Sequence, residues 1–207
     1  MNRTSNQRPA VFLDKDGTLL ENIPYNVDPA KMRFAPGAGE ALELLARSPF
    51  RLVVVSNQGG VAHGRFAQEA LHGVERQLRR MFERCGATLD AACWCPHDPA
   101  GHVMPYASAC LCRKPQPGML LRAGRELRLD LTRSWMVGDI LNDVEAGNRA
   151  GCRSVLVDCG NETEWQSAPR RLPYAIVANL YEATQMIVER HAYESRGPRA
   201  MCETVLR

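Results

Sequence analysis

Leu52-Val53-Val54-Val55 is a stretch of four consecutive apolar residues, and it decides the class of fold. A strand with one face in water alternates apolar and polar residues, whereas a strand of a parallel sheet has helices over both faces. Five more short runs are bounded by turn or polar residues: Ala10–Leu13, Ala91–Trp94, Trp135–Val137, Ser154–Val157 and Ala175–Val177. We therefore expect these six runs to form a parallel sheet.

The segment between the runs at 52–55 and 91–94 has the periodicity of an amphipathic helix. Its apolar residues recur every three or four positions and stop near Gly86: Ala67, Ala70, Leu71, Val74, Leu78, Met81 and Phe82. Strands that alternate with helices are typical of a doubly wound α/β fold. Such folds place their chemistry at the carboxyl ends of the strands, so the residues that follow the runs are the candidates for function: Asp14, Ser56, Cys95, Asp139 and Asp158.

Length and composition indicate one domain that is stable without a partner. The chain has 207 residues, of which 45% are hydrophobic and 24% are charged, and this is enough to form a single core. We expect a monomer with one domain over residues 1–192 and a loop inserted at 95–112. Residues 193–207 contain Gly, Pro and Arg without periodicity, and we expect a tail there.

Charge and hydropathy exclude several classes of partner. The chain has 26 Lys and Arg against 23 Asp and Glu, and apart from a modest cluster around residues 76–84 the basic residues are spread out, so we expect no nucleic-acid binding. Met1–Pro9 is polar, and no stretch approaches the roughly 18 apolar residues of a membrane span. We expect a soluble cytoplasmic protein. In that compartment its eight cysteines are more typical of free thiols or metal ligands than of disulfides.

Acidic residues follow two of the predicted strands. Val11-Phe12-Leu13-Asp14-Lys15-Asp16-Gly17-Thr18-Leu19 places two carboxylates after the first strand, and Gly17 allows a sharp turn. By itself, an Asp-x-Asp pair is more often a turn that caps the next segment. Asp139 follows the fourth strand, however, and adjacent strand ends would bring Asp14, Asp16 and Asp139 together. Because clustered carboxylates repel one another, we expect them to hold a hard divalent cation such as Mg²⁺.

Two further segments add groups that bind anions. Ser56-Asn57-Gln58 offers hydroxyl and amide donors, and Arg113-Lys114-Pro115 follows a loop rich in cysteine. By themselves, Ser56 is an ordinary turn residue and Lys114 a solvated charge. In this order, Asp-x-Asp-Gly-Thr, Ser, Lys and Gly-Asp-x-x-x-Asp resemble the four motifs of the haloacid dehalogenase superfamily of phosphatases, over roughly residues 10–190.

The resemblance implies a mechanism for the acidic residues. Asp14 would be the nucleophile that forms an aspartyl phosphate. Asp16 would protonate the leaving oxygen and later deprotonate water, for which its pKa must be raised. Mg²⁺ would be held by the Asp14 side chain, the Asp16 carbonyl and Asp139. Asp143 has two open roles, since it would either support Lys114 or Asp139 or cap the helix that follows.

The resemblance also implies which residues bind the substrate. Ser56 and Lys114 would hold the phosphoryl oxygens, and Lys114 would supply a positive charge to the transition state. Asn22-Ile23-Pro24-Tyr25 would line a sugar pocket, although this segment is equally typical of a proline turn. The complete implied set is Asn22, Tyr25, Ser56, Asn57, Gln58, Arg113 and Lys114.

A loop with thiols at both ends is a candidate zinc site. Cys95-Pro96-His97 and Cys110-Leu111-Cys112 supply three thiols and one imidazole, which is a tetrahedral ligand set, although the spacings are tighter than those of zinc fingers. Other interpretations are open. Cys93 and Cys95 are also typical of buried strand residues, two thiols could form a disulfide, and His102 or Cys93 could replace a ligand.

The resemblance is more specific in this loop. Cys-x-His followed by Cys-x-Cys-Arg-Lys-Pro is similar to the subgroup of the superfamily that acts on heptose bisphosphates or histidinol phosphate. It implies a structural zinc ion at Cys95, His97, Cys110 and Cys112, in a loop that takes the place of a large cap domain. The remaining thiols have no assigned role: Cys85, Cys93, Cys152, Cys159 and Cys202.

The segment Ser56-Asn57-Gln58-Gly59-Gly60-Val61-Ala62-His63-Gly64 is nearer to the heptose pattern of this subgroup than to the histidinol pattern. The resemblance therefore implies a phosphorylated sugar as substrate, namely a heptose 1,7-bisphosphate that loses its 7-phosphate in the synthesis of lipopolysaccharide precursors. Histidinol phosphate is the alternative, and a non-catalytic zinc-stabilised interaction module is a more remote one. The sequence departs from the heptose pattern at two positions. His63 stands where arginine is usual, and Ile140 stands where lysine is common. Both departures bear on how a second phosphate is held.

Overall fold

The computed structural model describes residues 7–196. One six-stranded sheet is formed by β1 (Ala10–Leu13), β2 (Arg51–Asn57), β3 (Ala91–Cys95), β4 (Trp135–Gly138), β5 (Arg153–Val157) and β6 (Ala175–Val177). The helices are α1 (Ala38–Ala46), α2 (Leu71–Arg84), α3 (Gly118–Glu126), α4 (Leu141–Ala150) and α5 (Leu180–Arg196). Each strand begins and ends within two residues of a predicted apolar run.

The strands lie in the order β3-β2-β1-β4-β5-β6, and every neighbouring pair is parallel. The predicted doubly wound α/β fold is confirmed. The chain moves outward from β1 to β3 and then returns to the other side of β1 to start β4. The carboxyl ends of β1 and β4 therefore form the switch point of the sheet, where folds of this kind bind ligands.

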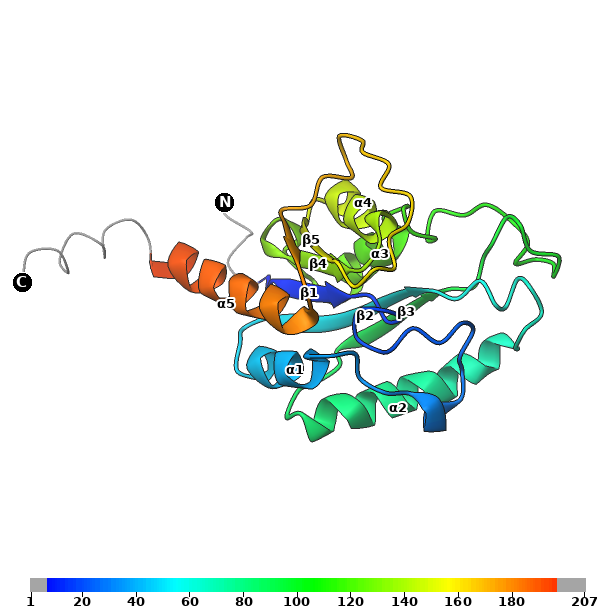
Figure 1. Cartoon of the computed structure of the whole chain (residues 1–207), viewed down its shortest axis with the longest axis horizontal. Helices are drawn as coiled ribbons and strands as arrows, with labels where there is room; N and C mark the ends of the chain where they lie inside the picture. The colour runs from blue at the N-terminus through cyan, green and yellow to red at the C-terminus, as the bar shows by residue number, and fades with distance from the viewer. Residues whose placement is uncertain (1–6, 197–207) are drawn as a thin grey trace, which may run out of the picture.

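Helices cover both faces of the sheet (Figure 1). Helices α1, α2 and α5 pack on one face, against inward side chains such as Val11 and Leu13 of β1. Helices α3 and α4 pack on the other face, against Ala10 and Phe12. Successive residues of β1 thus enter opposite cores, and all four are fully buried. This double burial is why the strand is apolar at consecutive positions.

The two predicted helix ends differ slightly from the observed ones. The apolar stripe that starts at Ala67 becomes α-helical only at Leu71, after a short 3₁₀ turn over Gln68–Ala70. Helix α5 continues through Arg196, four residues into the predicted tail, and the rest of that tail lies outside the described residues, as does Cys202. Within residues 7–196, no helix is both long and apolar enough to cross a membrane.

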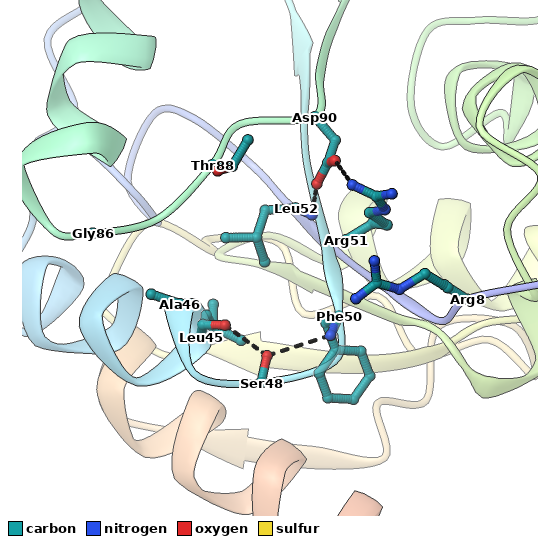
Figure 2. Close-up of a pocket in the computed structure, with 10 residues that line it drawn as sticks. All are labelled: Arg8, Leu45, Ala46, Ser48, Phe50, Arg51, Leu52, Gly86, Thr88 and Asp90. Atoms are coloured by element: carbon teal, nitrogen blue, oxygen red, sulfur yellow. Dashed lines mark hydrogen bonds and ion pairs between the residues drawn. The ribbon is translucent and has the colours of Figure 1, made fainter.

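A polar hollow lies at the amino ends of β1 and β2 (Figure 2). Two of its charged groups form an ion pair: the Arg51 guanidinium donates to Asp90 at 2.6 Å, and the other Asp90 oxygen accepts from the Leu52 amide at 2.8 Å. Arg8 donates to the Pro49 carbonyl at 3.3 Å. These bonds fasten the start of β2 to the segments that lead into β1 and β3.

Candidate active site

A second hollow lies at the opposite end of the sheet, where β1, β2 and β4 terminate. It collects most of the candidates that the sequence suggested, and its lining residues are Asp14, Asp16, Asn22, Ser56, Asn57, Lys114, Asp139, Ile140, Asp143 and Asn161, the last of which the sequence did not suggest. The Asp14 amide donates to the Val137 carbonyl of β4 at 2.9 Å, which joins the end of β1 to the neighbouring strand. The switch point of the sheet thus brings together residues from distant parts of the chain.

Gly17 permits the close approach of the turn after β1 to the end of β4. Its φ of +88° lies in the left-handed region that glycine adopts freely. A Cβ atom at this position would overlap the Oδ2 atom of Asp139 and the Nδ2 atom of Asn161. The glycine is therefore required both by the backbone and by the carboxylate packed against it.

Three buried carboxylates lie close to one another, and two of them pair with a buried lysine. Ligand oxygens of Asp14, Asp139 and Asp143 lie within 4.8 Å of one another. The Lys114 ammonium pairs with Asp14 and, at 2.6 Å, with Asp143, and it also donates to the Val55 carbonyl at 3.2 Å. Burial by itself would lower the pKa of Lys114, but Asp14 and Asp143 raise it above its usual value, so the lysine is charged.

One lysine does not neutralise this cluster. Burial, together with the charges of Asp14 and Asp143, raises the pKa of Asp139 to about 7. Burial and Asp14 also raise the pKa of Asp143 to about 6, against the opposing effect of Lys114. The donor set consists of hard carboxylate oxygens with a deficit of positive charge, and a divalent cation of the Mg²⁺ type fits it. Asp143 also accepts from the Ile140 amide at 3.3 Å, so it both supports Lys114 and caps α4.

The Asp16 side chain lies apart from this cluster. Its carboxylate pairs with the buried Lys15 ammonium at 2.7 Å and accepts from the Gln58 side-chain amide at 3.3 Å. Burial raises the pKa of Asp16, Lys15 lowers it and Asp14 raises it, with a net increase over the usual value. A raised pKa favours the protonated form, which is the form that can donate a proton.

The end of β2 supplies the contacts that hold this side of the hollow. The Asn57 side chain donates to the Lys114 carbonyl at 3.0 Å and accepts from the Lys114 amide at 2.9 Å. The Gln58 side chain donates to the Ser56 hydroxyl oxygen at 2.8 Å. The resemblance implies that Asn57 contacts the substrate, but in the structure both polar atoms of its side-chain amide bond to the backbone of Lys114.

The four predicted zinc ligands converge at one end of their loop. Sulfur atoms of Cys95, Cys110 and Cys112 lie 3.1–3.5 Å apart, and the His97 Nδ1 atom lies 3.5 Å from Cys112 and 3.7 Å from Cys95. Ligands around tetrahedral zinc are separated by about 3.8 Å when Zn–S bonds are about 2.3 Å. All seven cysteines in the described part of the chain are unbridged, and neither Cys93 nor His102 belongs to this group. The arrangement fits one zinc ion.

The zinc loop leads directly into Arg113 and Lys114. The Arg113 amide donates to the Cys110 sulfur at 3.3 Å. Its guanidinium donates to the His97 carbonyl at 3.0 Å and to Asp98 at 2.8 Å, and the His63 imidazole lies 3.4 Å from the same carboxylate. The loop thus holds Arg113 in place through both its backbone and its side chain.

A third hollow adjoins the acid cluster and shares Asp16, Asn22 and Asn57 with it. Its other lining residues are Pro24, Tyr25, Gln58, Gly59, Gly60, Asp98 and Arg113. Every predicted substrate-binding residue therefore lines one of these two adjoining hollows. Asn22 is common to both, so one elongated ligand can contact the acid cluster and Arg113 together.

Sequence reasoning missed two residues with clear contacts to the site. Asp98 pairs with Arg113, and Asn161 donates to Asp139 at 2.7 Å. Asn161 lies just beyond β5, so the rule that chemistry gathers at strand ends would have found it with a slightly wider window. Asp98 is in a loop without periodicity, and only the folded loop shows its partner.

The parallel sheet, the acid cluster at its switch point and the buried lysine define a hydrolase of the haloacid dehalogenase type. Comparison with known families agrees, since a family model described as HAD-hydrolase-like matches residues 111–183. The chain belongs to the haloacid dehalogenase superfamily and is a phosphatase.

Similarity to individual proteins is more specific. D-glycero-beta-D-manno-heptose-1,7-bisphosphate 7-phosphatase of Yersinia pestis is 39% identical over 153 residues, which is 73% of this chain and 81% of that protein. The protein of the same name from Photorhabdus laumondii is 41% identical over 69% of this chain and 76% of its own length. A crystal structure of D,D-heptose 1,7-bisphosphate phosphatase from B. bronchiseptica, complexed with magnesium and phosphate, superposes with a TM-score of 0.72 at 28% identity, covering 88% of this chain and 99% of that one.

Proposed function

We propose that this protein is a Mg²⁺-dependent phosphatase that removes the 7-phosphate of D-glycero-D-manno-heptose 1,7-bisphosphate during the synthesis of lipopolysaccharide precursors. One observation carries the proposal: Asp14 lies at the switch point of the sheet, paired with the buried Lys114, in a cluster of three carboxylates that has a deficit of positive charge. The names of the two bacterial relatives support the choice of substrate.

In the first step, an Asp14 carboxylate oxygen attacks phosphorus and forms an aspartyl phosphate. The bond from phosphorus to the sugar oxygen breaks, and protonated Asp16 donates its proton to that leaving oxygen. Lys114 and the Ser56 hydroxyl bind the phosphoryl oxygens as charge develops on them. Asn57 fixes the backbone from which the Lys114 side chain extends, because it bonds to both the amide and the carbonyl of Lys114.

In the second step, Asp16 accepts a proton from water, and the resulting nucleophile attacks phosphorus. The bond to the Asp14 oxygen breaks, phosphate leaves, and the Asp14 carboxylate is restored. Gln58 and Lys15 keep the Asp16 carboxylate in one place through both proton transfers. The Asp14 and Asp139 side chains and the Asp16 carbonyl would hold Mg²⁺, which would offset the repulsion between the nucleophile and the phosphate oxygens.

The zinc ion has a structural role in this proposal. Three cysteines and one histidine fill a tetrahedral coordination sphere, which leaves no position for water or substrate. Burial raises the pKa of the Cys95 thiol in the metal-free protein, so zinc must displace a proton to bind there. The zinc site fixes the segment that carries Arg113 and Lys114.

The remote part of the substrate would lie in the hollow lined by Tyr25 and Arg113, with Asn22 between it and the acid cluster. Arg113 can bind sugar hydroxyls or a second phosphate through the N–H groups that Asp98 and the His97 carbonyl leave free. His63 lies beside Asp98 at this hollow, whereas Ile140 lines the acid-cluster hollow, so only the His63 departure bears directly on the remote phosphate.

Phosphate release from a panel of substrates tests the proposal. The panel contains heptose 1,7-bisphosphate, other sugar phosphates, histidinol phosphate and an aryl phosphate, each with Mg²⁺ and with EDTA. We expect the heptose bisphosphate to give the highest kcat/KM and Mg²⁺ to be required. Zinc content is measured in each sample, so that loss of Mg²⁺ is separated from loss of zinc. Faster hydrolysis of histidinol phosphate would replace the proposed substrate, and full activity without Mg²⁺ would contradict the proposed metal.

A further inference from the structure

The loop that follows β5 reaches the acid cluster through one side chain. We propose that Asn161 is a positioning residue that holds the Asp139 carboxylate in the orientation needed to bind the divalent cation. This inference rests on the proposed function, in which Asp139 is a Mg²⁺ ligand. It adds a residue that lies outside the four motifs by which the superfamily is recognised.

The contacts of Asp139 show why its orientation depends on Asn161. The Asn161 Nδ2 atom donates to the Oδ2 atom of Asp139 at 2.7 Å, and the Thr18 hydroxyl donates to the Oδ1 atom at 3.3 Å. Each carboxylate oxygen can accept in two directions, so both oxygens still have a lone pair for a cation. The shorter of these two bonds comes from Asn161. Donors of this kind fix the rotation of a metal-binding carboxylate.

The loop that carries Asn161 is itself held in two places. The Asn161 Nδ2 atom lies 3.2 Å from the Cys159 sulfur, and that sulfur lies 3.4 Å from the Gly17 carbonyl. The next residue, Glu162, accepts from the Leu141 amide at 2.6 Å and so ties the loop to the start of α4. The loop is thus fastened both to the turn that carries Asp14 and to the helix that carries Asp143.

The space around Gly17 shows that Asp139 and Asn161 pack together against the turn after β1. A Cβ atom at position 17 would overlap both the Asp139 carboxylate and the Asn161 amide. The glycine therefore makes room for the hydrogen-bonded pair and not for Asp139 alone.

A purely structural role for Asn161 predicts a different result from a positioning role. If Asn161 only latched the loop, removing its amide would lower stability to the same extent with and without Mg²⁺. If it orients Asp139, the loss is mainly in affinity for the ion. Asn148 provides a matched control, because its side-chain amide holds the same loop by donating to the carbonyls of Arg170 and Leu172 at 2.9 Å, yet does not contact Asp139.

The experiment measures Mg²⁺ affinity by calorimetry, and the Mg²⁺-dependent shift in melting temperature, for the full chain with zinc bound. The variants are Asn161→Ala, the size-matched Asn161→Leu, Asn148→Ala and Asp139→Ala, each checked by circular dichroism. Loss of a group that orients a metal ligand typically weakens binding by about 10–100-fold. We expect this loss in whichever Asn161 variants fold, with Mg²⁺ affinity in Asn148→Ala within about twofold of the parent.

Several outcomes would overturn the inference. Parental Mg²⁺ affinity in folded Asn161 variants would show that the amide does not orient Asp139, and so would an equal loss in Asn148→Ala. Either result, combined with loss of binding in Asp139→Ala, would leave the proposed function intact. If the parent and Asp139→Ala bound Mg²⁺ equally, the metal site of the proposed function would be wrong, and this inference would fall with it.

Discussion

The two ends of the sheet differ in how far their carboxylates are compensated by hydrogen-bond donors and positive charges. At the amino end, the Asp90 carboxylate is satisfied by Arg51 and by a backbone amide, so the hollow there contains paired groups (Figure 2). At the carboxyl end, Asp14 and Asp143 share one lysine, Asp139 lies close to both without a cationic partner of its own among residues 7–196, and the pKa of Asp139 rises to about 7. Clusters of carboxylates that repel one another are typical of functional sites, where a bound ligand offsets the repulsion. Here the cluster indicates a divalent cation and a phosphorylated substrate. Of these two hollows, the one with crowded carboxylates is the proposed site of function.

The strongest test of this contrast removes the nucleophile. Asp14→Asn is expected to reduce turnover by roughly 10³-fold or more, because an amide cannot form the acyl phosphate. The fold and the zinc content should not change. Steady-state phosphate release measures the loss, and zinc analysis and circular dichroism serve as controls. Substantial activity in the purified variant would exclude the aspartyl-phosphate mechanism.

The second test disrupts the zinc loop. Cys110→Ser should remove zinc and lower the melting temperature by roughly 5 °C or more, which corresponds to about 2 kcal/mol in a domain of this size. Activity should fall at the same time, because the ligands support the segment that carries Lys114. Cys85→Ser is the matched control, since Cys85 is a free thiol outside the cluster. Equal stability, zinc content and activity in the two variants would rule out the zinc site.

The third test concerns the remote part of the substrate pocket. Arg113→Ala is expected to lower kcat/KM for the heptose bisphosphate by roughly tenfold, or about 1.4 kcal/mol of transition-state stabilisation. An aryl phosphate without hydroxyls or a second phosphate should be almost unaffected. Lys114→Ala, in contrast, should lower kcat/KM for both substrates, because Lys114 is proposed to bind the transferred phosphoryl group. Equal losses on both substrates in Arg113→Ala would remove its role in specificity.

The smallest effect is expected at the amino end of the sheet. Asp90→Ala removes the partner of Arg51 and leaves the Leu52 amide without its acceptor, at a cost of about 1–2 kcal/mol in the free energy of unfolding. Activity at a temperature where the variant is folded should equal that of the parent. Denaturant unfolding and kcat/KM measure the two quantities. A large loss of activity in folded Asp90→Ala would break the contrast between a structural end and a functional end.

The sequence predicts the sheet well because burial on both faces leaves a local signal. Runs such as Ala10–Leu13 and Leu52–Val55 are apolar at consecutive positions, and no other feature of the chain is needed to assign them. The convergence of Asp14 with Asp139 follows from parallel strands that end at one edge. Ligand convergence in the zinc loop was suggested by residue type and spacing, together with a family resemblance.

The remaining contacts depend on the folded chain. The Asn57 amide holds the backbone of Lys114, which is 57 positions away in sequence. Asp98 meets Arg113 where the three cysteines and His97 converge and bring the two ends of the loop together, and Asn161 reaches Asp139 from a segment without periodicity. Each is a single polar contact between segments that are distant in sequence. No local pattern of apolar residues predicts such a contact.

The position of β1 between β2 and β4 has a consequence for the order of synthesis. A nascent chain that ends after β3 contains the strands β1, β2 and β3, which are neighbours in the sheet, and can begin to fold from its N-terminal part. Asp14 is then present without Asp139 and Asp143, so the half-made protein does not yet bear the full repulsion of the cluster. The carboxylates meet only when β4 is added beside β1. The acid cluster is therefore completed late in synthesis, because a chain that ends after β3 contains neither Lys114 nor Asp139.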